Sequence, residues 1–305
     1  GTRGHVRAID CGQWGASVGY TGEIASNERI GMLAISPGTV TFNDNGGSAV
    51  RFAAVRSSDN ITHNCTNIGI SGFSGAPLAV ASQNHRDGGD GGWLHRCSVS
   101  ASNVQVMVQE DVAADSDTAH TTERAGLAAF SQAFDASPGA GGAPMEASTV
   151  TIPSSSGGSL TFTQVTFANT MDSVPRVFVL PTAGEPEPAS LRVRNVSTGA
   201  FEVAQVMPTG EAGAAASMTI DWFAVVDGIH DLDGKTTLEV GSLSTSDVQY
   251  GSPVTGPQGW TTLNFGHSFG ATPAVLFEIQ NTNNEPGLNP STPSVPWLEV
   301  TAQNA

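Results

Sequence analysis

The sequence has few charged residues and almost no lysine. Only 13% of its 305 residues are charged, roughly half of the usual share in soluble proteins, and Lys235 is the single lysine. Twelve basic residues stand against 28 acidic ones, which gives a net charge of −16 at pH 7. A chain this acidic, without a basic cluster, does not attract nucleic acid or an anionic membrane surface. Both are therefore excluded as partners.

Long apolar runs and helical periodicity are scarce as well. No apolar run approaches the roughly 20 residues that a membrane-spanning helix needs, so no membrane span is expected. Short alternating runs separated by turn residues occur instead, for example at 161–167, 176–180, 191–196 and 201–206. This pattern predicts antiparallel strands in sandwiches or barrels. One stretch, 125–136, fits either a helix or a buried strand.

Motifs of the common enzyme classes are absent from the sequence. It contains no Gly-x-Ser-x-Gly, no His-Glu-x-x-His, no phosphate loop ending in Gly-Lys-Ser/Thr and no paired-cysteine zinc spacing. The seven histidines are scattered along the chain. We therefore expect a protein that is not an enzyme.

Cysteine is rare, with three copies in the chain. Cys65 and Cys97 each adjoin a strand-like run within one predicted unit and are the natural disulfide pair. Cys11 is then either free and buried or bonded to another chain, and the alternative is three reduced, buried thiols. The scarcity of lysine and the turns rich in Gly, Asn, Asp, Ser and Thr favour an extracellular or cell-surface location.

A repeated opening signature divides the chain into three similar units. An apolar residue, three further residues and a proline precede a strand-like run, and the prolines, Pro77, Pro175 and Pro273, are spaced 98 residues apart. A proline suits the first position of a strand because no ladder donor is needed there. The length alone would have suggested two domains.

A closing signature shows that one unit is split between the two ends of the chain. Glu-Arg-x-Gly-x-x-Ala occurs at 28–34 and 123–129, and a looser copy lies at 219–225. No opening signature precedes the first copy of the closing signature, and no closing signature follows the last opening signature. We therefore predict two complete repeats, 41–140 and 141–232, and one split unit. Residues 236–305 form the first half of the split unit, and residues 1–40 form its second half. Two domains with unstructured tails are the alternative.

A split β-domain exposes unpaired strand edges, and three arrangements would cover them. The halves close within one chain, the C-terminal half of one subunit is completed by the N-terminal half of the next, or the chain is one period of a longer array. We favour completion between subunits, which gives an open filament unless the contact closes into a ring. The expected interface residues are Trp297, Leu298, Val300, Val6, Ile9, Ile30 and Leu33.

Three motifs resemble a known family. They are Phe-x-x-x-Met-x-x-x-Pro-x-Val at 167–177, Asn-Val-Ser-Thr-Gly-Ala-Phe at 195–201 and Asp-Trp-Phe-Ala-Val at 221–225. This stretch of about 60 residues resembles the H-type lectin domain, a six-stranded antiparallel β-sandwich of secreted agglutinins, and the other two units resemble it loosely. Segments 84–94 and 120–124 are also similar to repeats in large surface proteins of marine bacteria. The resemblance implies an all-β chain of tandem antiparallel β-sandwich domains, one of them split.

An acidic loop is the candidate metal site. Asp111, Asp115 and Asp117, flanked by Glu110, His120 and Glu123, offer oxygen ligands of the kind that Ca²⁺ prefers, and Asp87 and Asp90 lie upstream in the same unit. The alternative is a solvated loop that forms ion pairs with Arg86, Arg96 or Arg124. Apart from this possible Ca²⁺ site, the sequence indicates no cofactor.

Two functions follow from these patterns. The first is a secreted structural protein that polymerises head to tail, so that its partner is itself, into an extracellular filament. The second is a carbohydrate-binding lectin or adhesin of the cell surface, with glycans as partners. Trp14, Trp222 and Trp260 could stack on sugars, although packing in a core is the more usual role of tryptophan.

Overall fold

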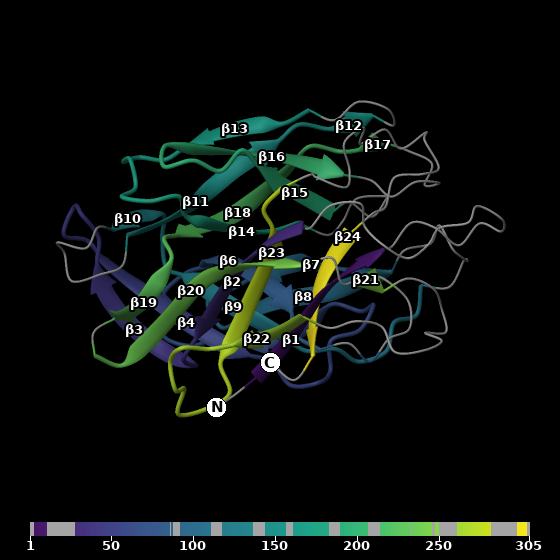
Figure 1. The fold of residues 1–305 in the computed structure, drawn as a ribbon, viewed down its shortest axis with the longest axis horizontal. Helices are drawn as coiled ribbons and strands as arrows, with labels where there is room; N and C mark the ends of the chain where they lie inside the picture. Colours follow the sequence, from purple (N-terminus) through teal and green to yellow (C-terminus); the bar gives the residue numbers. More distant parts are fainter. Residues whose placement is uncertain are drawn as a thin grey trace.

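A computed structural model of the chain describes residues 3–10, 28–85, 87, 92–110, 118–136, 144–156, 161–182, 190–206, 214–232, 234–245, 248–249, 261–281 and 298–303. These residues form 24 strands and the turns between them, without a helix, which confirms the prediction of an all-β protein (Figure 1). No helix among them is long and apolar enough to cross a membrane. The ambiguous stretch 125–136 forms two strands, and every residue of the first is buried.

The first unit packs one four-stranded sheet against one three-stranded sheet. The larger sheet has the order β3 (Gly38–Asn43), β4 (Ala49–Arg56), β9 (Ala125–Phe130) and β6 (Leu78–Gln83). The smaller sheet has the order β5 (Thr66–Gly69), β8 (Asn103–Glu110) and β7 (Gly92–Val99). Cys65 and Cys97 form a disulfide within this unit, as the sequence predicts.

The second unit repeats this arrangement. Its larger sheet has the order β10 (Phe134–Ala136), β11 (Met145–Ile152), β18 (Met218–Val225) and β14 (Arg176–Leu180). Its smaller sheet has the order β13 (Thr163–Thr166), β16 (Ala200–Val206) and β15 (Ser190–Arg194). The short strands β12 (Ser155–Ser156) and β17 (Ala214–Ala215) pair with each other.

The third unit is assembled from both ends of the chain. One sheet has the order β19 (Gly228–Leu232), β20 (Thr236–Thr245), β2 (Glu28–Ile35) and β23 (Ala274–Ile279). In the other sheet β1 (Arg3–Asp10) pairs with β21 (Val248–Gln249), β22 (Thr261–Asn264) and β24 (Leu298–Gln303). The first described strand, β1, and the last, β24, lie side by side (Figure 1).

This pairing differs from the completion between subunits that the sequence analysis favours. Ile30 lies opposite Leu243 and Ile279, and Leu33 lies opposite Val240 and Leu276. The remaining expected interface residues within the described ranges also pair inside the chain: Val6 with Ala302, Ile9 with Glu299, Val300 with Ala8 and Leu298 with Asp10. Trp297 lies outside the described residues. The N-terminal half therefore finds its missing strands in its own chain.

The sheets also divide the chain slightly earlier than the predicted limits. The strands β3, β10 and β19 each follow a closing strand directly and pair into the next sheet, with β4, β11 and β20 respectively. The chain therefore passes from one four-stranded sheet into the next soon after each closing signature. A strand counted with the preceding repeat in the sequence thus belongs structurally to the following unit.

A single apolar core joins the three four-stranded sheets. It contains residues from every unit, among them Leu33, Phe130, Phe223 and Leu276. The rings of Phe130 and Phe223, which come from different units, have centroids 4.7 Å apart. Side chains on the opposite faces of the same sheets fill three further cores within the units. Because the closing strands are buried on both faces, their sequences are almost continuously apolar rather than alternating.

The edge strands β6, β14 and β23, which follow the three repeated prolines, meet where the units join. Ser82 Oγ of the first unit accepts a hydrogen bond from Phe277 N (2.9 Å) and donates one to Phe277 O (2.8 Å) in the third. Gln280 of the third unit pairs with both backbone groups of Val177 in the second. Asp221 of the second unit accepts a hydrogen bond from Ala79 N in the first (2.7 Å). On each of these edge strands, one residue thus forms a backbone hydrogen bond with a side chain of a neighbouring unit.

The glycine of the repeated Glu-Arg-x-Gly motif lies at these junctions. A Cβ atom on Gly126 would lie 2.2 Å from Val275 O and 2.6 Å from Val275 N, and one on Gly31 would lie 3.3 Å from Arg176 Cβ. The equivalent residue of the second unit is Asp221, whose carboxylate bonds to the neighbouring strand. The motif therefore allows two backbones from different units to approach closely.

We expect Gly126→Ala to destabilise the folded chain by about 1–3 kcal/mol, because the new methyl group overlaps backbone atoms that have little freedom to move. Equilibrium unfolding in urea measures this change. Gly241→Ala is the matched control, since its Cβ would be 3.6 Å from the nearest neighbouring atom, the terminal methyl of Met32. Equal stability of Gly126→Ala and the wild-type chain would contradict the close approach of the first and third units.

Candidate functional site

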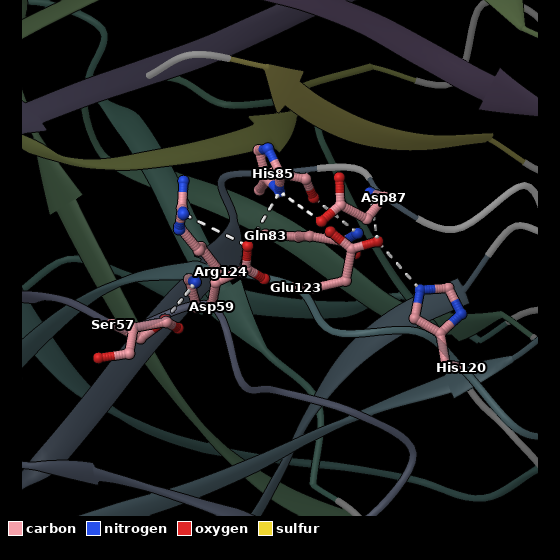
Figure 2. Close-up of polar contacts among 10 residues, drawn as sticks. Ser57, Asp59, Gln83, His85, Asp87, His120, Glu123 and Arg124 are labelled. Carbon is pink, nitrogen blue, oxygen red and sulfur yellow. Dashed lines mark hydrogen bonds and ion pairs between the residues drawn. The ribbon is translucent and has the colours of Figure 1, made fainter.

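A group of polar side chains gathers at one end of the four-stranded sheet of the first unit (Figure 2). Antiparallel pairing of β4 and of β6 with β9 brings the C-terminal ends of β4 and β6 to the start of β9. Asp59 follows β4, His85 and Asp87 follow β6, and Glu123 and Arg124 precede β9. We call Asp59, His85 and Asp87, with Gln83, His120, Glu123 and Arg124 around them, the strand-end cluster.

Backbone hydrogen bonds continue past the strands and fix these segments. Ser57 N donates to Ala125 O (2.8 Å), and Asn84 N donates to Arg124 O (2.7 Å). Ile61 and Glu123 form a β-bridge with hydrogen bonds of 3.1 and 2.7 Å. The strand-end cluster is therefore held by an extension of the sheet.

Three side chains of the strand-end cluster direct ligand-type atoms toward one another. His85 Nδ1 lies 3.4 Å from Asp87 Oδ2 and 3.9 Å from Asp59 Oδ2. Asp59, His85 and Asp87 each offer one ligand atom, and these three atoms all lie within 4.8 Å of one another. Residues of these types at such separations could hold a metal ion.

The buried side of the strand-end cluster positions Asp87. Glu123 has 0% exposure, and its Oε1 accepts a hydrogen bond from Asp87 N (3.0 Å). The same oxygen is 3.2 Å from Nε2 of the buried His120. Arg124 Nη2 lies 3.3 Å from Asp59 Oδ2, so one ion pair of the kind considered for a solvated loop is present.

The sequence analysis located part of this site. Its candidates Asp87, His120 and Glu123 come together, while Asp111, Asp115 and Asp117 lie outside the described residues. Asp59 and His85 were missed because they are 26 residues apart and belong to no acidic run. Their position two or three residues beyond buried strands is the signal that would have found them.

The third unit has the same framework but different side chains. Gln280 N donates to Arg29 O (2.8 Å), which matches the bond from Asn84 to Arg124. The position equivalent to His85 is Asn281, whose Oδ1 accepts a hydrogen bond from Arg29 N (3.0 Å). By the 98-residue spacing the second unit has Ala183 at this position. The histidine is therefore particular to the first unit.

A second polar region lies at the junction of the three units. Ser82, Leu180 and Glu278 occupy equivalent positions of β6, β14 and β23 and line one hollow with Trp93 and Arg192. Burial raises the pKa of Glu278 to about 8, although the charge of Arg192 and hydrogen bonds from Val179 and Ile279 act in the opposite direction. At neutral pH this carboxyl group is therefore largely protonated.

The tryptophans in the described residues are part of the cores. Trp222 is 2% exposed and contacts Phe167 and Phe201, with ring centroids 5.9 and 5.4 Å away. Trp93 is also buried. Trp222 therefore does not form the sugar-stacking surface considered from the sequence, and Trp14 and Trp260 lie outside the described residues.

Comparison with known proteins gives no relative: no family model, no curated protein and no solved structure matches this chain.

We expect Glu278 to make the folded chain less stable as the pH rises from about 4.5 to about 8. Its pKa is raised in the folded state, so the stabilisation is complete below the unfolded pKa of 4.5 and is lost as the pH passes through 8. Unfolding free energies at pH 5 and pH 8.5 measure this slope. Glu278→Gln should flatten the slope. If the unfolding free energy of Glu278→Gln depended on pH as strongly as that of the wild-type chain, the raised pKa of Glu278 would be contradicted.

Proposed function

We propose that the chain is a secreted, non-enzymatic binding protein of the lectin or adhesin type. In this proposal it acts as a single block of three β-sandwich units that presents its loops to neutral glycans. The observation that carries the proposal is the completion of the split unit within one chain, where β2 lies between β20 and β23.

This completion weakens the case for a filament built by strand exchange. The driving force for that assembly is an unpaired strand edge and half of a core. Here β1 and β2 have partners on both sides from the same chain, and Ile30 and Leu33 are fully buried. A self-contained block favours the second function expected from the sequence, that of a lectin-like protein.

Repetition and charge support a glycan as the ligand. Three similar units fused through one core hold several loop regions in fixed relative positions, and loops on a rigid scaffold are the usual place for binding residues. Weak individual contacts to a repetitive ligand then add through multivalency. The net charge of −16 disfavours acidic glycans, so neutral sugars are the expected class.

We expect the purified chain to remain a monomer of 31.2 kDa over a wide concentration range. Each strand edge at the junctions already has a partner, so concentration should not drive assembly. Multi-angle light scattering measures the mass, and electron microscopy of the same sample detects fibres. Growth of the mass with concentration, or fibres with a regular axial repeat, would support the head-to-tail polymer instead.

We expect the folded chain to bind neutral glycans on an array and to bind sialylated or sulfated glycans weakly. The acidic surface repels the negatively charged sugars, and raising the salt concentration should reduce that difference. The heat-unfolded chain serves as the control for non-specific adsorption. The absence of any neutral binder would rule out the lectin function.

A further inference from the structure

We propose that the strand-end cluster binds one divalent transition-metal cation, with Asp59, His85 and Asp87 as its protein ligands. The inference is independent of the proposed glycan binding, because it concerns a site formed by three strand ends of the first unit.

The spacing of the three ligand atoms fits one cation. Metal bonds to histidine nitrogen and carboxylate oxygen are about 2.0–2.2 Å long, so two ligands of one ion are at most about 4.4 Å apart. The atoms of Asp59, His85 and Asp87 lie within 4.8 Å of one another. Ligand atoms of a tetrahedral ion with such bonds are about 3.3–3.6 Å apart, so side-chain adjustments of up to about 1.5 Å bring all three to bonding distance.

Gln83 is an independent indication of a ligand at this place. Its side chain lies between His85 and Glu123 in Figure 2, it is 5% exposed, and its Nε2 donates to His85 O (3.0 Å). Its buried Oε1 accepts no hydrogen bond from any residue that the structure describes, and the same holds for Asp59 Oδ1. A buried acceptor without a donor costs about 1–3 kcal/mol, and a cation or its bound water would satisfy these groups.

The charges around the three ligands favour a cation. Asp59, Asp87 and Glu123 bring three carboxyl groups to the cluster, while two arginines bring positive charge: Arg124 Nη2 lies 3.3 Å from Asp59 Oδ2, and Arg56 interacts electrostatically with Asp59. That contact engages the Asp59 oxygen nearest to His85 Nδ1, whereas Asp59 Oδ1 accepts no hydrogen bond from a described residue, so a cation either displaces Arg124 or binds Oδ1 after the carboxylate rotates. Glu123 accepts a hydrogen bond from the backbone N–H of Asp87. It therefore positions this ligand without contacting the metal itself.

The histidine decides the class of metal. Ca²⁺ and Mg²⁺ prefer oxygen ligands throughout, whereas imidazole with carboxylates suits Zn²⁺ and similar transition metals. This site therefore differs in place and in chemistry from the Ca²⁺ site predicted at Asp111, Asp115 and Asp117. Only one such site is expected in each chain, because the equivalent positions hold Ala183 and Asn281.

The test is a calorimetric titration of the full chain, freed of metal with EDTA, with Zn²⁺ and in parallel with Ca²⁺. We expect one Zn²⁺ per chain, no comparable uptake of Ca²⁺ and a higher melting temperature in the presence of Zn²⁺. His85→Gln and Asp87→Asn should each weaken Zn²⁺ binding at least tenfold. His267→Gln is the matched control, because this histidine belongs to the third unit and packs against Phe269.

Three outcomes would overturn the proposal. They are the absence of Zn²⁺ binding by the wild-type chain, unchanged affinity in His85→Gln and Asp87→Asn, or an equal loss in His267→Gln. Circular dichroism and unfolding of the metal-free variants show whether they fold. A second pair, Asp59→Asn and Gln83→Met, tests the site if one of the first variants does not fold, with tenfold weaker binding again expected for Asp59→Asn.

Discussion

The hydrogen-bonding groups at the edges of β6, β14 and β23 determine how the three units are arranged. These edges meet inside the molecule, where an unpaired N–H or C=O group is costly. Ser82, Gln280 and Asp221, one from each unit, satisfy the backbone of the neighbouring unit in a cyclic order. The shared aromatic core and the close approach at Gly126 require this arrangement, because they exist only when the three sheets face one another.

The sequence predicts the strands and their repetition, but not the partner that completes the split unit. The equal spacing of Pro77, Pro175 and Pro273 reflects three equivalent edge strands, and the apolar closing signatures reflect strands buried on both faces. Closure within a chain and exchange between chains bury the same pairs, for example Ile30 against Ile279. A residue pattern therefore does not distinguish them, whereas the path of the chain between the units does.

The residue pattern is likewise insufficient to predict the candidate site. Sequence analysis detects acidic residues that lie close together along the chain, and so it favoured the acidic loop containing Asp111. The strand-end cluster is dense only in space, because three neighbouring strands deliver Asp59, His85 and Glu123 to one edge. Asp221 is a similar case: it interrupts the repeated glycine position, and its role appears only once Ala79 of another unit is seen beside it.

The position of β1 and β2 between strands from the far end of the chain has a consequence for biosynthesis. Strands β1 and β2 leave the ribosome well before β20, β23 and β24, which all lie after residue 235. The third unit therefore folds only after β24 has been synthesised, and its contacts, such as those of β1 with β24, span a long stretch of sequence, which slows folding. Until then the apolar strand Glu28–Ile35 lacks a partner. An unpaired apolar strand of this kind is a place where another copy of the chain can pair before the third unit closes.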